Sequence, residues 1–193
     1  NCRTSLRNLM PRIVSSETIY GVVFVEPKVF NDDRGIFVET WRQEWFPGAP
    51  PMIQNNRADR QAGSLVGLHF HLHQSDYWYV PFGTARVVLH DLRQGSPTEG
   101  ATICTNLGTR DDGTHNHGGV YIPPGVAHGF SALSDLTITY LVDGYYNPDD
   151  ELGVAWDDPE INADWGVAEP VLSLRDQANP RRAAIEPALR PRF

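Results

Sequence analysis

Residues 63–83 read GSLVGLHFHLHQSDYWYVPFG, and this stretch decides how the rest of the chain is interpreted. Within it, histidine occurs at every second position from 69 to 73. Because successive side chains of a β-strand point to opposite faces, the alternation predicts a strand with His69, His71 and His73 on one side. If the strand belongs to a barrel, that side can be the interior.

The same alternation recurs in short segments on both sides of this stretch. Aromatic and β-branched residues dominate these segments, and turn residues such as Asp32-Asp33-Arg34-Gly35 and Asn147-Pro148-Asp149 separate them. Short strands at regular spacing favour an antiparallel sandwich or barrel, so we expect a mostly β protein. Only residues 41–46 and 181–189 carry weak helix signals, and Pro187 interrupts the second.

Length and composition suit one soluble globular domain. The chain has 193 residues, of which 40% are hydrophobic and 21% charged, and such values are ordinary for globular proteins. No repeat or linker divides it, so we expect a single domain over 1–193 with a core of about 17–180. Residues 1 to about 15 and the segment after Pro180 are expected to form terminal arms.

Charge and cysteine content exclude several classes of partner. The net charge of −8 argues against a nucleic-acid surface, because phosphate binding requires clustered Lys and Arg. No apolar run of 18 residues is present to span a membrane, and the first residues lack the apolar region of a signal peptide. Cys2 and Cys104 form no CxxC pattern, which favours a reduced, cytoplasmic protein.

The spacing of polar residues around the histidines resembles a known fold family. Gly63, His69, His71, Asp76 and Gly83 follow the first cupin motif, with Asp in place of its usual Glu. A second segment at 123–128, PPGVAH, resembles the core of the second motif. The resemblance implies a cupin, or jelly-roll, antiparallel β-barrel with short helices and terminal arms.

A more specific resemblance covers most of residues 17–180. It is carried, in the family's order, by DDRGIFVETW at 32–41, IQNN at 53–56, GLHF at 67–70, DLRQGSPTEG at 91–100, IPPGVAHGF at 122–130, TYLVDGYYNPDDELGVAWDDP at 139–159 and LSLRD at 172–176. Together these segments resemble the dTDP-4-dehydrorhamnose 3,5-epimerases. The resemblance implies epimerisation of a dTDP-4-keto-6-deoxy sugar at C3, C5 or both, in deoxysugar biosynthesis and without a cofactor.

The resemblance implies three catalytic residues. His69 matches the base that removes a proton beside the C4 ketone, and Asp176 matches the carboxylate paired with that base. A neutral imidazole can accept a proton near neutral pH, and an adjacent carboxylate stabilises the resulting cation. Tyr140 matches the acid that returns a proton from the opposite face.

The resemblance also implies binding residues and a homodimer. His128 supports the base, Tyr146 lies where a ring stacks on thymine, and the remaining nucleotide and diphosphate contacts are Gln54, Asn56 and Arg175. Arg34, Phe37 and Glu39 match positions that family members donate from the neighbouring subunit. The implied partners are therefore the dTDP-sugar substrate and a second copy of the chain.

The sequence departs from the family at two cationic positions. An Arg before GLHF is replaced by Val66, and a Lys near the sugar ketone is replaced by Asp76. One hypothesis is that Asp76 pairs with Arg86. Another is that His69, His71, Asp76 and His128 form an N3O metal set, with the ion replacing the Lys as electrophile.

Two alternatives to a cofactor-free epimerase therefore stay open. A metal-dependent cupin enzyme, such as a dioxygenase or sugar isomerase, would use the N3O set named above. The cofactor-free nucleotide-sugar ketoisomerases share HxH-type histidines but would not be expected to carry DLRQGSPTEG. A binding protein that lost catalysis is the other alternative, because Asp76 would repel an anionic diphosphate sugar.

Overall fold

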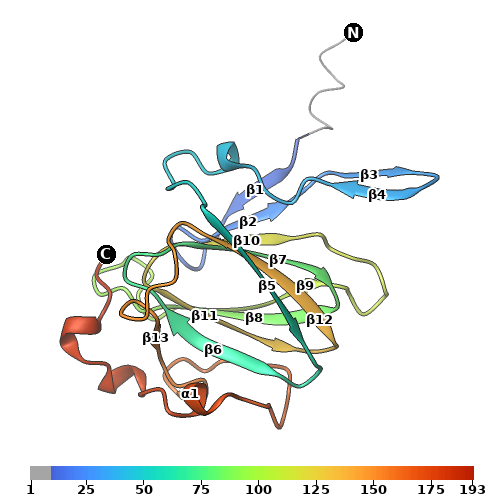
Figure 1. The fold of residues 1–193 in the computed structure, drawn as a ribbon. Helices are drawn as coiled ribbons and strands as arrows, with labels where there is room; N and C mark the ends of the chain where they lie inside the picture. The colour runs from blue at the N-terminus through green and yellow to red at the C-terminus, as the bar shows by residue number, and fades with distance from the viewer. Residues whose placement is uncertain (1–9) are drawn as a thin grey trace.

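The computed structural model describes residues 10–193, which form two antiparallel sheets and a projecting hairpin (Figure 1). The larger sheet has six strands in the order β1 (Arg12–Ser15), β2 (Val23–Glu26), β10 (Gly119–Ile122), β7 (Asp76–Phe82), β12 (Leu136–Val142) and β5 (Gln54–Arg60). The smaller sheet has five strands in the order β13 (Leu152–Gly153), β6 (Leu65–Phe70), β11 (Val126–Ala132), β8 (Thr84–Asp91) and β9 (Thr102–Gly108). The hairpin consists of β3 (Val29–Asp32) and β4 (Gly35–Val38). The prediction of a mostly β, jelly-roll type barrel is confirmed.

The two sheets enclose the main hydrophobic core. Trp78 and Ile138 come from the six-stranded sheet, whereas Val87, Leu89 and Phe130 come from the five-stranded sheet, and all five are buried in one cluster. Their burial follows the alternation seen in the sequence, since every second side chain of these strands faces inward. Burying apolar area of this kind is the main favourable contribution to folding.

Two further clusters cover the outer faces of the sheets. Trp45 and Phe46 pack with Tyr77, Tyr79 and Tyr121 on the six-stranded sheet. On the other sheet, the C-terminal third of the chain supplies the cover, including Trp165 and Ile185. The segment after Pro180, expected as an arm, therefore contributes a buried residue, because the five-stranded sheet has an apolar outer face to cover. Residues 12–15, also expected in an arm, form edge strand β1.

Helical structure is sparse and differs from the sequence expectation. The stretch 41–46 contains only the 3-10 helix η2 (Gln43–Trp45), and 181–189 contains two such turns, η3 (Arg182–Ala184) and η4 (Pro187–Leu189). The α-helix α1 (Leu174–Gln177) lies elsewhere, with Ser173 as its N-cap. None of the helices in residues 10–193 has the length and apolar character that a membrane-spanning helix needs.

A bulge between β6 and β11 sets the direction of the catalytic candidate His69. His69 pairs with His128, but Val66 pairs with Phe130, so three steps on β6 match two on β11. Gly67 lies inside this bulge with φ of 109°, and an added Cβ would come within 2.8 Å of the Cα of Gly129. The bulge therefore requires glycine, and it turns both Val66 and His69 toward the barrel interior.

Candidate active site

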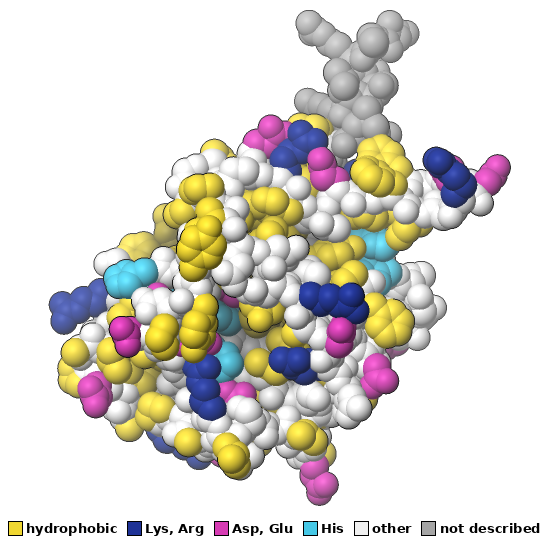
Figure 2. Space-filling model, in the orientation of Figure 1, with side chains coloured by type: hydrophobic (Ala, Val, Ile, Leu, Met, Phe, Trp, Pro, Cys, Tyr) yellow, Lys and Arg dark blue, Asp and Glu magenta, His cyan; other side chains and the backbone are white. Residues whose placement is uncertain are grey.

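A cavity of about 290 Å³ opens at one end of the barrel, between the two sheets. Figure 2 shows this face hollowed near its centre, with histidine side chains inside and cationic side chains at the rim. Strand register explains the lining, because Tyr140 lies opposite both Asn56 and Trp78, and Val142 lies opposite both Gln54 and Asp76. Residues directly opposite in antiparallel strands share one face, so β5, β7 and β12 present one continuous wall of polar and apolar side chains.

His69 and Asp176 form the central contact of the site. His69 Nε2 lies 2.6 Å from Asp176 Oδ1, and Asp176 is 4% exposed. The Ser173 hydroxyl accepts a hydrogen bond from the Asp176 N–H and so caps the start of α1. Burial opposes ionisation of Asp176, but its hydrogen bond with His69 lowers the pKa of the carboxyl below its ordinary value. A carboxylate in this position fixes the ring so that Nδ1 is the free nitrogen.

Tyr140 lines the same cavity from β12. Burial raises the pKa of its hydroxyl, and the negative charge of Asp76 raises it further. The phenol therefore stays protonated at neutral pH. The cavity thus holds both a group that can accept a proton and a group that can donate one.

Most of the expected binding residues also lie in the cavity wall. Gln54 Nε2 donates to Asn56 Oδ1 at 2.8 Å, so these two side chains are held together. Arg175 donates to the Glu151 carbonyl oxygen at 2.8 Å, which places its guanidinium at the rim. Tyr146 is 69% exposed at the same opening. An exposed ring and an exposed guanidinium are suited to contact an aromatic base and an anion.

Three expected binding residues lie away from the cavity. Arg34 and Phe37 belong to the β3–β4 hairpin, which projects from the barrel in Figure 1, and Phe37 is 68% exposed. Arg34 is paired with Asp32 in the hairpin turn, and Glu39 accepts a hydrogen bond from Arg42 at 2.6 Å. Within one chain these residues do not complete the site.

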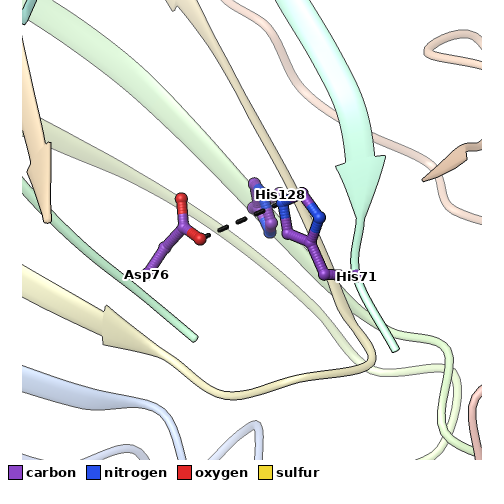
Figure 3. Close-up of side chains that lie close together, drawn as sticks. All are labelled: His71, Asp76 and His128. Carbon is purple, nitrogen blue, oxygen red and sulfur yellow. Dashed lines mark ion pairs between the residues drawn. The ribbon is translucent and has the colours of Figure 1, made fainter. Parts of the chain in front are cut away.

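A second polar group lies deeper in the cavity, made of His71, Asp76 and His128 (Figure 3). Each of the three is 5% exposed or less. Burial lowers the pKa of His128 to about 4, so its imidazole is neutral at neutral pH. His69, which the sequence grouped with them as a metal ligand, is outside this set, because the ligand atoms that lie within 4.8 Å of one another come only from His71, Asp76 and His128. Its Nε2 contacts Asp176 instead.

Two details of the sequence interpretation are wrong. The structure pairs Arg86 with Asp164 and Asn106 rather than with Asp76. The reason is that Arg86 points out of the barrel toward the C-terminal cover, whereas Asp76 points in. His73 does not share a face with His69 and His71, because β6 ends at Phe70 and the chain bends at Leu72 and His73. His73 is exposed and lies outside the cavity.

Other residues of the cavity wall were not expected from the sequence. They are Ala58, Arg60, Gln74, Trp78, Phe130, Val142 and Glu151. Arg60 ends β5 on the same face as Gln54 and Asn56, so period-two counting from IQNN would have found it. Glu151 lies next to Asp150 in a loop, and no periodic signal marks it.

The fold and this site define a class of protein, namely a cupin-type barrel enzyme with a histidine–aspartate pair in a cavity that a tyrosine also lines. Residues 16–183 match the family model described as dTDP-4-dehydrorhamnose 3,5-epimerase. The chain belongs to the dTDP-4-dehydrorhamnose 3,5-epimerase family, whose named members are isomerases.

Relatives and solved structures agree with this assignment. The dTDP-4-dehydrorhamnose 3,5-epimerase of Shigella flexneri is 36% identical over 163 residues, covering 80% of this chain and 87% of the relative. The dTDP-4-dehydrorhamnose 3-epimerase of Streptomyces niveus is 38% identical over 167 residues, covering 82% of this chain and 78% of the relative.

Two solved structures extend the comparison to almost the whole fold. NovW, a 4-keto-6-deoxy sugar epimerase from the novobiocin gene cluster of Streptomyces spheroides, superposes with a TM-score of 0.86 at 34% identity, covering 95% of this chain and 94% of that one. The epimerase of Legionella pneumophila, solved with dTDP-4-keto-L-rhamnose, superposes with a TM-score of 0.85 at 31% identity, covering 95% of this chain and 98% of that one.

Proposed function

We propose that this chain epimerises a dTDP-linked 4-keto-6-deoxy sugar at C3, C5 or both, as a step of deoxysugar biosynthesis. The observation that carries the proposal is the 2.6 Å contact between His69 and Asp176 in a cavity that Tyr140 also lines. Family membership supports the substrate class, because the named relatives act on such sugars.

The proposed reaction moves one proton off and one proton onto the same carbon. His69 Nδ1 takes the proton from the carbon next to the C4 ketone, and the electron pair of that C–H bond moves into the enolate. Asp176 stabilises the imidazolium that forms. Tyr140 then donates its hydroxyl proton to the other face of the carbon, which inverts the configuration. Proton exchange with solvent returns His69 and Tyr140 to their starting states.

The rim of the cavity supports binding of a nucleotide diphosphate. Arg60 and Arg175 supply two guanidinium groups at the opening, and guanidinium binds phosphate oxygens in pairs. We propose that Arg60 binds part of the diphosphate. In the family the Arg before GLHF helps to hold the diphosphate, and in this chain that position is the apolar Val66. Gln54, Asn56 and Tyr146 would contact the nucleotide, with the Tyr146 ring stacking on the base.

Solvent exchange tests the proposed function. Purified protein is incubated with dTDP-4-dehydro-6-deoxyglucose in deuterated water, and the C3 and C5 proton signals are followed by NMR. The proposal expects loss of one or both signals, and the signal that disappears identifies the reacting centre. His69→Asn should abolish the exchange. If the wild-type protein leaves both signals intact, the proposed activity is wrong for this substrate.

The buried carboxylate of Asp76 favours a second candidate, a sugar-nucleotide-binding protein without turnover. A negative charge facing an anionic diphosphate sugar weakens binding and stabilises no enolate. Calorimetric binding of the nucleotide sugar without any deuterium exchange would select this candidate over the epimerase.

We also propose that the active form is a homodimer in the cytoplasm. In this arrangement the β3–β4 hairpin of one chain extends over the cavity of its partner, bringing Arg34, Phe37 and Glu39 to the substrate. Support comes from the exposure of Phe37 and Ile36, 68% and 57%, on a hairpin that forms a separate two-stranded sheet and pairs with no other strand among residues 10–193. Exposed apolar side chains of this kind mark interaction surfaces.

A further inference from the structure

The cluster at the base of the cavity joins three elements of the fold. Asp76 begins β7, His128 lies in β11, and His71 directly follows β6. One nitrogen or oxygen atom from each lies within 4.8 Å of the others, and His71 Nε2 is 4.0 Å from Asp76 Oδ1. Figure 3 shows that the side chains point toward a common centre. At these separations they do not hydrogen-bond to one another.

Contacts outside the cluster determine which ring nitrogens face its centre. His71 Nδ1 lies 2.7 Å from the Asp150 carbonyl oxygen, and His128 Nδ1 lies 3.0 Å from the Val126 carbonyl oxygen. A carbonyl oxygen only accepts, so each Nδ1 carries the hydrogen and donates. In a neutral imidazole the other nitrogen, Nε2, then has a free lone pair. Both lone pairs are available toward the centre of the cluster, and carbonyl contacts of this kind orient histidine ligands in metal sites.

Asp76 is likewise held by donors outside the cluster. Gln74 Nε2 donates to Oδ1 at 2.9 Å, and Trp78 Nε1 donates to Oδ2 at 3.0 Å. Among residues 10–193, no Lys or Arg lies within ion-pair distance of this carboxylate. The cluster therefore brings two nitrogen lone pairs and a carboxylate together in a buried place, and it supplies no cation of its own. Such a set of acceptors is expected to bind a positively charged group.

We propose that His71, Asp76 and His128 bind a divalent first-row transition metal ion. Two imidazole nitrogens and one carboxylate oxygen suit zinc, iron(II), cobalt or nickel, and a set of three leaves coordination positions open. Bonds of about 2.1 Å allow ligand atoms to lie up to about 4.2 Å apart, so small side-chain rotations close the set. The open positions face the cavity that His69 and Tyr140 line.

The metal site is separate from the His69–Asp176 pair, although both serve the same cavity. Its role toward a ketone oxygen rests on the proposed function, because an ion there would be a Lewis acid beside the sugar. Binding of the ion does not depend on that function and is measured without substrate. A chain that binds no metal but still exchanges deuterium would overturn the metal site alone, and a metal-binding chain without exchange would overturn the epimerase alone.

Cobalt and zinc titrations of the tag-free protein test the site. Protein stripped with a chelator is titrated with Co²⁺ while visible absorption is recorded, and with Zn²⁺ by calorimetry. We expect one ion per chain and d–d bands of a low-coordinate site. Asp76→Asn and His128→Gln should each weaken binding at least about tenfold, since even loss of an outer hydrogen-bond partner costs that much.

Matched variants separate this site from adventitious histidine binding. His73→Gln removes an exposed histidine next to the cluster, and His115→Gln with His117→Gln removes a second histidine pair whose rings lie 4.3 Å apart. Neither change should alter the stoichiometry or affinity. Circular dichroism verifies that each variant is folded. Wild-type protein that binds no stoichiometric ion, or Asp76→Asn and His128→Gln proteins that bind it unchanged, would overturn the proposal.

Discussion

His69 and Asp176 are 107 residues apart in sequence, yet His69 Nε2 lies 2.6 Å from Asp176 Oδ1. The contact exists because α1 docks against β6, with Ser173 capping the helix one turn before the carboxylate. The contact fixes the orientation of the His69 ring, because the ring is held through Nε2 and only Nδ1 is left to act as a base. The activity of the site should therefore depend on the charge of Asp176.

Asp176→Asn should reduce kcat by about 10²–10⁴-fold with a smaller change in KM, because the imidazolium loses its counter-charge. Steady-state rates of epimerisation measure the effect. Glu151→Gln provides the control, since Glu151 Oε1 is 3.9 Å from His69 Nδ1 and does not hydrogen-bond to it. If both substitutions reduce kcat equally, general electrostatics rather than the pair explains the rate.

Tyr140→Phe should separate deprotonation from inversion. His69 can still remove the proton, so deuterium exchange should continue, while formation of the inverted product falls by roughly 10²-fold or more. One NMR time course on the variant records both quantities. Loss of exchange together with inversion would show that Tyr140 acts before or during proton removal. Tyr145→Phe is a suitable control, because Tyr145 does not line the cavity.

Complementation tests the proposed exchange of hairpins between subunits. Arg34→Ala and His69→Asn should each inactivate the homodimer. Mixed dimers contain one site with both changes and one site with neither, so random exchange should restore roughly a quarter of the wild-type rate. The rate is measured before and after subunit exchange at equal total protein. A mixture that stays inactive after exchange, as verified by mass spectrometry, would place both residues in one subunit's site.

Asp91→Asn should destabilise the fold in a pH-dependent way. Asp91 is fully buried and binds Arg93, Ser96 and Thr98. Burial alone would raise the pKa of Asp91, but these hydrogen bonds, Arg93 first, lower it below the ordinary value of 3.8. Because the pKa of Asp91 is lower in the folded state than in the unfolded state, its charge contributes fully to stability above the unfolded-state pKa. This contribution disappears as pH falls through the folded-state pKa. Because the substitution leaves the charge of Arg93 without its partner, it should lower the free energy of unfolding by about 3 kcal/mol at neutral pH.

Urea unfolding of both proteins between pH 7 and pH 3 measures this difference. The gap in unfolding free energy should be constant near neutral pH and should narrow below about pH 4. Asp111→Asn, an exposed change, serves as the control. A gap that stays the same at every pH would mean that the charge of Asp91 contributes nothing.

Gly67→Ala should be far more destabilising than Gly113→Ala, although both glycines have positive φ, 109° and 80°. At Gly113 nothing lies within 4 Å of an added Cβ, so the cost is about 1–2 kcal/mol of backbone strain. At Gly67 the Cβ would also meet the His128 carbonyl oxygen at 2.8 Å. Thermal unfolding compares the two variants. Equal decreases in melting temperature for the two variants would show that the bulge between β6 and β11 can relax around the added methyl group.

Local patterns in the sequence were sufficient for much of the fold and part of the site. Period-two alternation predicted the strands and placed His69 and His71 on one face, since alternate side chains of an extended backbone point the same way by covalent geometry alone. The order of short motifs identified the family, and the same motifs pointed to Tyr140, Gln54 and Asn56, which the structure brings to one cavity.

Tertiary structure alone decided how these residues are grouped. Alternation placed His69 and His71 together, but in the fold His69 contacts Asp176 of α1. Backbone carbonyl oxygens accept from Nδ1 of His71 and His128, which leaves their Nε2 atoms toward Asp76. The direction of Arg86 and the end of β6 before His73 also depended on packing. Sequence determined which side chains share a strand face, because that follows from the backbone repeat. The folded chain determined which partners they meet, because those contacts join segments far apart in sequence.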